Sequence, residues 1–359
     1  MTDPVRESAR TSDFEYELTE EMIGREPAEP RDSARLLVAL GVEIQHRRVG
    51  DLAEFVGPGD VIVLNSTRVL PARVPLRRET GGAAEVLLLE PIVDGWWEAL
   101  VRPSRKVPPG TLLRAGRSDT FGFEIGDDLG DGRRLVLPIS MAAGQTSGTP
   151  VEGDDLLAAL ELVGQMPLPP YLGDLELSDP ERYQTVFSER AESAAAPTAG
   201  LHLTEELIER LRAAGATIVH IELVVGLGTF RPISADHIAD HEMHHERYRI
   251  PEDVWASVQS ADRVIAVGTT SVRALESAAA TGVLDGSTNL FISRPYPWRV
   301  VDVMMTNFHQ PRSSLLVMID AFVGRRWREI YRVATDEGYR FLSFGDAMLL
   351  GRDERVVRA

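Results

Sequence analysis

The segment 193–204, which reads SAAAPTAGLHLT, brings several reactive or ligand-binding residue types into one short turn. Thr198, Gly200 and His202 stand directly before EELIERLRAAG, whose apolar spacing predicts a helix. The first turn of a helix carries unpaired backbone N–H groups and a partial positive charge. We therefore expect this turn to hold the imidazole of His202, together with helix N–H groups, beside a bound ligand.

A second candidate turn lies in VGTTSVRAL (267–275), where the pattern predicts that a strand ends and a helix begins. Backbone N–H groups and the hydroxyls of Thr269 and Thr270 can bind a carboxylate or a phosphate there, and Arg273 follows in the first turn. A well-capped helix explains the same residues equally well. The segment does not contain G-x-G-x-x-G, so it is not a dinucleotide-binding motif.

Imidazoles and carboxylates crowd together in DHEMHHE (240–246). The letters from His241 onward fit H-E-x-x-H, in which zinc proteases place two histidines on one face of a long helix. The polar flanks and Pro251 argue against such a helix. We expect proton transfer by His241, His244 and Glu246 instead, since imidazole titrates near neutral pH. A solvated charged loop is the alternative.

Two further segments combine polar and apolar residues in a way that indicates a ligand. TNFHQPRSS (306–314) places Asn307, His309 and Arg312 around a turn before an apolar helix, which favours a polar ligand. FGDAMLL places Asp346 inside an apolar run. A buried carboxylate is costly without a partner, so we expect an arginine or a substrate beside Asp346.

Local basic groups could bind phosphates, although solvated arginines are the commoner reason for such residues. They lie in LNSTRVLPARV (64–74), in VRPSRK (101–106) and in the glycine-rich segment GLGTFR (226–231). The candidates are Arg68, Arg73, Arg102, Arg105, Lys106 and Arg231.

Composition limits the class of protein. The chain has 359 residues, 43% hydrophobic and 26% charged, which favours a globular protein of two domains. No run of eighteen apolar residues and no secretory signal is present, so we expect a cytoplasmic protein without a membrane partner. The absence of cysteine excludes disulfides and cysteine–zinc sites. The net charge of −17 argues against non-specific coating of nucleic acid.

The order of predicted elements indicates an α/β fold with an insertion. Apolar runs such as 60–65 and 263–268 read as buried strands, and strands alternate with helices after residue 164. Between 72 and 163 short strands and glycine turns follow one another, which is typical of a small β-barrel or sandwich. We predict a large α/β domain, 1–71 and 164–359, interrupted by an all-β insert, 72–163.

Taken together, these motifs resemble one known family. LNSTRV, GQMPLPPY, AAPTAGLHLT, GLGTFRPI, DHEMHHE, VIAVGTTSVRALES and TNFHQPRSS occur in that order within residues 13–350. The chain resembles the S-adenosylmethionine:tRNA ribosyltransferase-isomerases of queuosine biosynthesis. The resemblance implies a large α/β domain with a mixed-sheet barrel flanked by helices, plus an inserted small β-barrel domain.

The resemblance also implies a reaction. The ribosyl unit of S-adenosylmethionine would be transferred and isomerised onto 7-aminomethyl-7-deazaguanine at the tRNA wobble position. The products would be epoxyqueuosine-tRNA, adenine and methionine, and no metal would be required. The implied partner is therefore a tRNA carrying that base, and we expect a monomer.

The resemblance and the residue chemistry together assign candidate roles. The catalytic candidates are His202, His241, His244, Glu246 and Asp346. The candidates for binding S-adenosylmethionine are Thr198, Gly200, Thr269, Thr270, Arg273, Asn307, His309 and Arg312. The candidates for binding tRNA are the basic residues named above. These residues do not reveal which side chain is the general base.

The chain departs from the family pattern in three places. Ser66 stands where LNDTRV carries an aspartate, Val225 stands where a histidine usually precedes GLGTF, and Glu192-Ser193 replaces Gly-Ser. These departures keep two alternatives open. One is a paralogue that uses S-adenosylmethionine with a different acceptor, and the other is a non-catalytic protein that binds S-adenosylmethionine or RNA.

Overall fold

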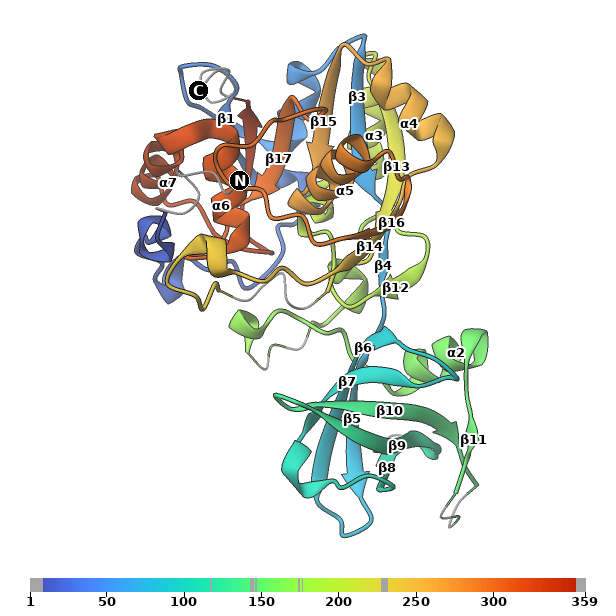
Figure 1. Ribbon diagram of the computed structural model, residues 1–359. Coiled ribbons are helices and arrows are strands. Elements are labelled where there is room, and N and C mark those ends of the chain that lie inside the picture. Colours follow the sequence, from blue (N-terminus) through green and yellow to red (C-terminus); the bar gives the residue numbers. More distant parts are fainter. Residues whose placement is uncertain are drawn as a thin grey trace. The chain divides into compact units, whose positions relative to one another are not determined.

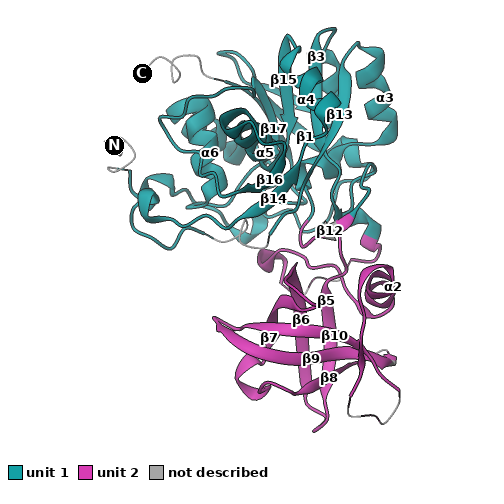
Figure 2. Cartoon of the chain, turned by 45° about the vertical axis from the view of Figure 1, so that its right-hand side comes forward, with its two compact units in different colours: residues 1–68, 181–190, 196–359 teal, residues 69–180, 191–195 magenta. Residues whose placement is uncertain are grey.

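The computed structural model describes residues 9–116, 118–142, 145, 147–173, 175, 177–226 and 232–352. The chain divides into two compact units (Figure 2). The larger unit comprises Met1–Arg68, Glu181–Arg190 and Ala196–Ala359, and the smaller comprises Val69–Pro180 and Ala191–Ala195.

The larger unit is built on a mixed sheet, shown in Figure 1. In the described part of the chain nine strands pair in the order β16-β14-β13-β3-β15-β17-β18-β1-β2. The strands β13, β3, β15 and β17 run parallel to one another, while β17 and β18 are antiparallel. Their bounds are β1 Arg35–Ala39, β2 Gln45–Arg48, β3 Asp60–Asn65, β13 Thr217–Leu223, β14 Glu246–Arg249, β15 Arg263–Val267, β16 Asp285–Thr288, β17 Val303–Asn307 and β18 Ala347–Gly351.

Helices follow β15 and β17 directly, as the alternating pattern predicts. The α-helices of this unit are α3 Glu205–Ala213, α4 Glu252–Gln259, α5 Thr269–Thr281, α6 Ser314–Val323 and α7 Trp327–Asp336. Its 3₁₀ helices include η1 Thr11–Phe14, η2 Glu20–Met22, η3 Arg31–Ser33, η4 Val49–Phe55, η8 Thr198–His202, η10 Ile238–Asp240 and η11 Gly324–Arg326. We find among the described residues no helix with the length and apolar character that crossing a bilayer requires.

Burial explains why these segments form strands and helices. All six residues of β3 and all five of β17 are buried, as expected for central strands of an α/β sheet. On one face Leu36, Ile62 and Met305 share a core cluster with Leu207 and Leu211 of α3. The apolar stripe that predicted α3 in the sequence is therefore the stripe that covers the sheet.

The smaller unit is a closed barrel. Strand β10 pairs with both β7 and β9, so the described order β10-β7-β6-β5-β8-β9 returns to its first strand. Inward residues such as Val74, Val86, Phe123 and Val136 are fully buried. The bounds are β5 Arg73–Arg78, β6 Ala83–Pro91, β7 Trp97–Arg102, β8 Leu112–Ala115, β9 Ser118–Gly130, β10 Arg133–Ser140, β11 Thr149–Pro150 and α2 Gly153–Val163.

The fold prediction is confirmed: the chain is mixed α/β, with a large mixed sheet and a closed six-strand barrel among the described residues. The smaller unit contains the predicted insert 72–163 and extends to residue 180. One reason lies in the backbone of Gln165, which exchanges two hydrogen bonds with Arg73 of β5, at 3.2 Å and 2.7 Å. Strands β4 (Arg68–Val69) and β12 (Ala191–Ser193) form a separate two-stranded pair.

Candidate functional site

The carboxyl ends of β15 and β17 gather the polar residues of two predicted turns. These strands are parallel neighbours, so their ends meet at one edge of the sheet, where open α/β sheets bind ligands. Segment η8 packs against β17, and the Cβ of Ala199 lies 3.9 Å from the position of a Cβ added to Gly268. We define the strand-end cluster as Thr198, His202, Gly268, Thr270 and Asn307.

The amide of Asn307 joins two residues of η8. Its Oδ1 accepts a hydrogen bond from Thr198 Oγ1 at 3.0 Å, and its Nδ2 lies 3.0 Å from His202 Nε2. Since the amide nitrogen donates, His202 Nε2 accepts, and the neutral imidazole carries its proton on Nδ1. The two residues of the opening motif are therefore oriented by one side chain from β17.

The surroundings of His202 favour the neutral form. Burial lowers the pKa of His202 to about 4, with further lowering from the guanidinium groups of Arg340 and Arg31. Arg31 also donates to the backbone oxygens of Gln184 and Leu201, at 2.9 Å and 3.2 Å. At neutral pH this imidazole can therefore accept a proton but holds no extra proton to give.

The predicted link between His202 and a helix start needs correction. His202 ends η8, and Thr204 is the residue that caps α3, its Oγ1 accepting from the backbone N–H of Leu207 at 3.1 Å. The helix start that faces the strand-end cluster is that of α5. Its N-cap is Gly268, which has no side chain to satisfy the first N–H groups.

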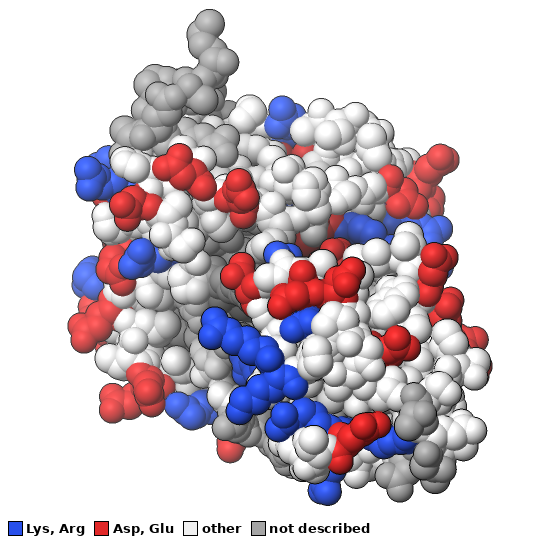
Figure 3. Space-filling model, turned by 60° about the horizontal axis from the view of Figure 1, so that its bottom comes forward, with Lys and Arg blue, Asp and Glu red and all other residues white. Residues whose placement is uncertain are grey.

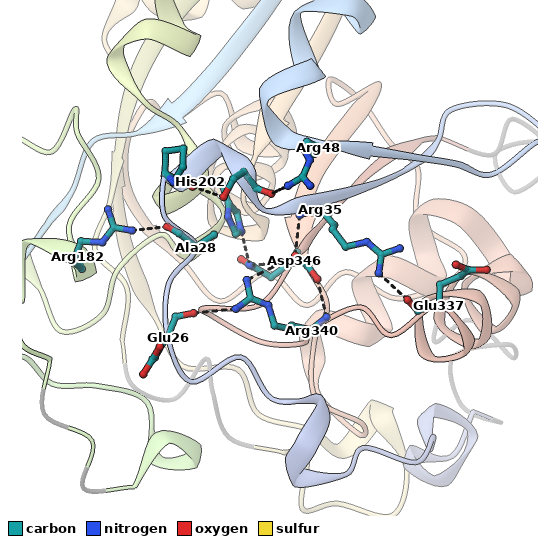
Figure 4. Close-up of polar contacts among 12 residues, drawn as sticks. Glu26, Ala28, Arg35, Arg48, Arg182, His202, Glu337, Arg340 and Asp346 are labelled. Atoms are coloured by element: carbon teal, nitrogen blue, oxygen red, sulfur yellow. Dashed lines mark hydrogen bonds and ion pairs between the residues drawn. The ribbon is translucent and has the colours of Figure 1, made fainter.

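Asp346 has the arginine partner that its burial required. Its carboxylate accepts from the backbone N–H groups of Arg35 and Arg340, at 2.9 Å and 2.7 Å, and lies 4.0 Å from the Arg340 guanidinium. Its carbonyl oxygen lies 3.5 Å from Asn307 Nδ2. Figure 4 shows Asp346 between His202 and these arginines. Asp346 thus fixes the backbone around the strand-end cluster.

Arginines that the motif analysis missed hold the segment 26–33 beside this cluster. Arg340 donates to the carbonyl of Glu26 at 3.2 Å, and Arg182 donates to that of Ala28 at 2.6 Å (Figure 4). Arg31 and Arg340 are the arginines that depress the pKa of His202. The hydrogen-bond partners of Arg31 and Arg340 include backbone carbonyls, which no sequence pattern predicts.

His309 and Arg312 lie apart from Asn307. His309 Nε2 lies 3.0 Å from Thr306 Oγ1, and neighbouring strand residues such as Thr306 and Asn307 point to opposite faces. Burial lowers the pKa of His309 to about 3. Arg312 is exposed, has a φ of 56° and lies 3.9 Å from Glu15. The structure therefore brings only Asn307 of this predicted trio into the strand-end cluster.

Glu246 and Arg273, predicted in separate roles, form a buried ion pair with each other. Arg273 Nη1 donates to Glu246 Oε2, and both side chains are 2% exposed. Glu246 Oε1 also accepts from the backbone N–H of Gly226 at 3.2 Å, while Arg273 Nη2 lies 3.5 Å from the carbonyl of Thr288. A ligand carboxylate that used Arg273 would have to displace Glu246.

The H-E-x-x-H segment lacks the geometry of a zinc protease. Residues 241–245 form no helix, so the two histidines do not share a helical face. The ring of His241 packs edge-on against Phe291, and burial followed by the charge of His244 lowers its pKa. His244 is exposed. Within the described ranges no group of three or more His, Cys, Asp or Glu side chains is placed to hold a metal ion.

The predicted basic residues divide between the two units. Arg102, Arg105 and Lys106 are exposed at the end of β7 and in η5 (Ser104–Lys106), a turn that buried Arg134 holds through the carbonyl of Ser104 at 2.9 Å. In the larger unit Arg68 pairs with Glu181 at 2.6 Å. Figure 3 draws Lys and Arg side chains in blue, with Asp and Glu side chains in red among them.

Arg73 and Arg231 are the two remaining basic residues that the sequence predicted for tRNA binding. Arg73 is half-buried in β5, and its Nε has no hydrogen-bond partner in the described residues. Arg231 lies outside the described residues.

Two departures from the family pattern lie in described parts of the chain. Ser66 Oγ lies 3.4 Å from the carbonyl of Ile221, and Val225 is buried. An ionised aspartate in the same orientation as Ser66 would face a carbonyl oxygen, so this turn is suited to a hydroxyl.

The two buried histidines predict how stability depends on pH. Folding lowers the pKa of His202 to about 4 and that of His309 to about 3, while the unfolded chain titrates near 6.5. The contribution of these histidines to the free energy of unfolding is therefore fully present above about pH 6.5. It is lost as the pH falls towards 4, by about 2 kcal/mol per histidine between pH 7 and 5. Urea unfolding should show a smaller pH dependence for His309→Gln. The exposed control His244→Gln should match the wild type, and equal curves for all three proteins would contradict the assignment.

Comparison with known proteins identifies the family of this chain. The model of a family described as "Queuosine biosynthesis protein" matches residues 11–350. The S-adenosylmethionine:tRNA ribosyltransferase-isomerase of Rubrobacter xylanophilus is 46% identical over 352 residues, covering 97% of this chain and 100% of that protein. The protein of the same name from Thermus thermophilus is 48% identical over 356 residues, covering 94% of this chain and 98% of its own.

A solved structure extends the likeness to the fold. The crystal structure of S-adenosylmethionine tRNA ribosyltransferase from Thermotoga maritima aligns with a TM-score of 0.53 at 33% identity, covering 94% of this chain and 100% of that one. The family match spans both units and every residue of the strand-end cluster. This chain therefore belongs to the queuosine biosynthesis protein family.

Proposed function

We propose that this chain is an S-adenosylmethionine:tRNA ribosyltransferase-isomerase, a transferase that acts on tRNA in queuosine biosynthesis. The observation that carries the proposal is similarity along the whole chain to enzymes of that name, from residue 11 to residue 350. The strand-end cluster lies inside this match and supplies a buried imidazole, an amide and a helix start at one sheet edge.

The finer reaction is part of the same proposal. The acceptor is 7-aminomethyl-7-deazaguanine at the wobble position, the products are epoxyqueuosine-tRNA, adenine and methionine, and no metal takes part. The enzyme works as a monomer in the cytoplasm. The larger unit is the catalytic one, and the smaller unit, which contains 72–163, carries the exposed Arg102, Arg105 and Lys106, which suit tRNA phosphates.

We assign the carboxylate of the donor to the start of α5. Thr270 Oγ1 is buried and has no hydrogen-bond partner in the described residues, so it awaits an acceptor. The first N–H groups of α5 and its dipole favour an anion at the same place. Thr269 is buried beside it, and Thr198, Gly200 and Asn307 complete the donor pocket in this proposal. Arg273 acts by holding Glu246.

We assign the general base to His202. The reaction removes a proton from the carbon beside the sulfonium, so an unprotonated base is needed. The imidazole of His202 is neutral at physiological pH because burial lowers its pKa to about 4. Its accepting atom, Nε2, accepts a hydrogen bond from the amide of Asn307. The substrate would have to take the place of that amide before Nε2 could remove a proton.

Product analysis tests the function. Purified protein would be mixed with S-adenosylmethionine and a tRNA carrying 7-aminomethyl-7-deazaguanine, and the products would be identified by mass spectrometry. Adenine, methionine and a modified wobble base support the proposal. Binding of S-adenosylmethionine without adenine release, with tRNA present, would contradict it and favour a different acceptor or a non-catalytic binding protein.

The two glycines that flank α5 provide a matched test of the donor pocket. Gly268 has a φ of 91°, and a Cβ there would lie 3.3 Å from Thr270 Oγ1, whereas Gly282 has a φ of 74° and open space around it. Both alanine substitutions should cost about 1–2 kcal/mol of stability through backbone strain. Only Gly268→Ala should also weaken S-adenosylmethionine binding, measured by calorimetry. Equal affinities for the two variants would remove the start of α5 from the donor pocket.

A further inference from the structure

A basic groove lies far along the sheet from the strand-end cluster. Its volume is about 1080 Å³, and it lies between the β1–β2 turn, the end of β18 and the beginning of α7. We call it the α7 groove. Five arginines and a single carboxylate, Glu329, are among its lining residues. The arginines are Arg325, Arg326, Arg328, Arg332 and Arg352.

The α7 groove is basic, whereas the whole chain is acidic. The chain has 55 Asp and Glu residues against 38 Lys and Arg, for a net charge of −17. An acidic protein repels polyanions at most of its surface, so a polyanion is held only where positive charge is concentrated. The α7 groove is such a place in the larger unit.

Not all five arginines are tied to the protein. Arg326 holds the β1–β2 turn through the carbonyls of Gly41 and Val42, the latter at 2.6 Å. Arg332 pairs with Asp336 at 2.9 Å in an exposed pair, and such pairs contribute little to stability. The side chain of Arg325 is exposed and makes no ion pair or hydrogen bond with the described residues. Arg325 and Arg332 are therefore available to a ligand at low cost.

The spacing of the arginines fits several phosphates. Arg325, Arg328 and Arg332 are three and four residues apart, so they lie along one face of the helical segment η11–α7. Seven residues of helix extend about 10 Å. A single small anion cannot contact both ends of such a row, whereas successive phosphates of a nucleic-acid strand can.

The position of the groove separates it from the chemistry. Strands β1 and β18 are parallel, and their first residues, Arg35 and Ala347, adjoin Asp346. Their far ends lead to Leu40 and Gly351, which line the α7 groove. Five strand residues extend roughly 15 Å. Phosphates bound in the α7 groove would therefore lie well away from the strand-end cluster.

We propose that the α7 groove binds backbone phosphates of the substrate tRNA at a distance from the base that reacts. This inference rests on the proposed function, which supplies the tRNA. The groove contributes affinity through the release of counterions, and it takes no part in the reaction. The guanidinium groups of Arg325 and Arg332 make these contacts, while Arg326 keeps the groove in shape.

The test compares two double variants with the same change in charge. Arg325→Gln/Arg332→Gln removes two charges from the groove and leaves Arg326 in place. Arg190→Gln/Arg212→Gln removes two exposed charges elsewhere on the larger unit, each from a surface ion pair. The dissociation constant of each protein for the tRNA substrate would be measured by filter binding over a series of salt concentrations. Adenine release would be measured at saturating tRNA.

The groove variant should bind tRNA about tenfold more weakly, and the slope of log affinity against log salt should become shallower by about two. Its rate at saturating tRNA should equal that of the wild type. Affinity and slope equal to those of the control variant would overturn the proposal for the groove while leaving the enzyme function intact. If instead the wild type neither binds tRNA nor releases adenine, the proposed function itself fails, and the groove proposal fails with it.

Discussion

His202→Ala is expected to slow adenine release roughly 10²- to 10⁴-fold, which is the usual contribution of a positioned general base. The imidazole is the buried titratable side chain that Asn307 orients at the ends of β15 and β17. Single-turnover release of adenine from S-adenosylmethionine, followed by chromatography, measures the effect. The affinity for S-adenosylmethionine should change little, because the donor carboxylate is assigned to the start of α5.

The pH profile separates a base from a merely structural histidine. Because burial lowers the pKa of His202 to about 4, kcat/KM should stay level down to well below pH 6.5 and then fall. His245→Ala is the matched control, since His245 is exposed and lies 3.3 Å from Ser287. A wild-type rate that falls with a midpoint near 6.5, or an active His202→Ala protein, would exclude His202 as the base.

Glu246→Gln is expected to lower the free energy of unfolding by about 3–5 kcal/mol, because it leaves the buried guanidinium of Arg273 without a counter-charge. Urea unfolding measures the loss. The amide keeps the size of the side chain, so the effect reports charge rather than a cavity. If Glu246 were instead an acid or base at the surface of the site, the same variant would keep its stability and lose its activity.

A double variant provides the control for the ion pair. Glu246→Leu/Arg273→Met removes both charges and keeps apolar volume, so it should recover much of the stability that Glu246→Gln loses. Such recovery indicates that the loss came from the unpaired charge. If the double variant lost as much stability relative to the wild type as the two single substitutions lose together, the two side chains would not be acting as a pair.

Hydrophobic periodicity predicted the strands and helices because each of them buries a stripe or a run of apolar residues that can be recognised in the sequence. DVIVLN became β3 and EELIERLRAAG became α3 with the expected buried face. The insert was visible for the same reason, since short strands with glycine turns have no helical stripe. The length of the smaller unit was harder to predict, because the backbone pairing of Gln165 with Arg73 involves no side-chain pattern.

The sequence predicted which residues belong to the site but not which of them contact one another. Thr198, His202 and Asn307 were each candidates, yet the bond between His202 and Asn307 spans 105 residues and exists because η8 packs against β17. Glu246 and Arg273 were likewise singled out separately. They pair because α5 contacts β13 and β16, the two strands between which β14 lies, a relation that depends on the order of strands in the sheet.

The place of β18 in the sheet has a consequence for biosynthesis of the chain. Residues 347–351 insert between β17 and β1, so β1 and β2 have no sheet to join until those residues leave the ribosome. The barrel strands, in contrast, lie within residues 73–140 and can close early. A nascent chain can therefore carry a finished barrel while its apolar β1 waits for a partner more than 300 residues away. The strand β1 can pair with β2 on one side, but its other edge must be kept from aggregating until synthesis has passed residue 351.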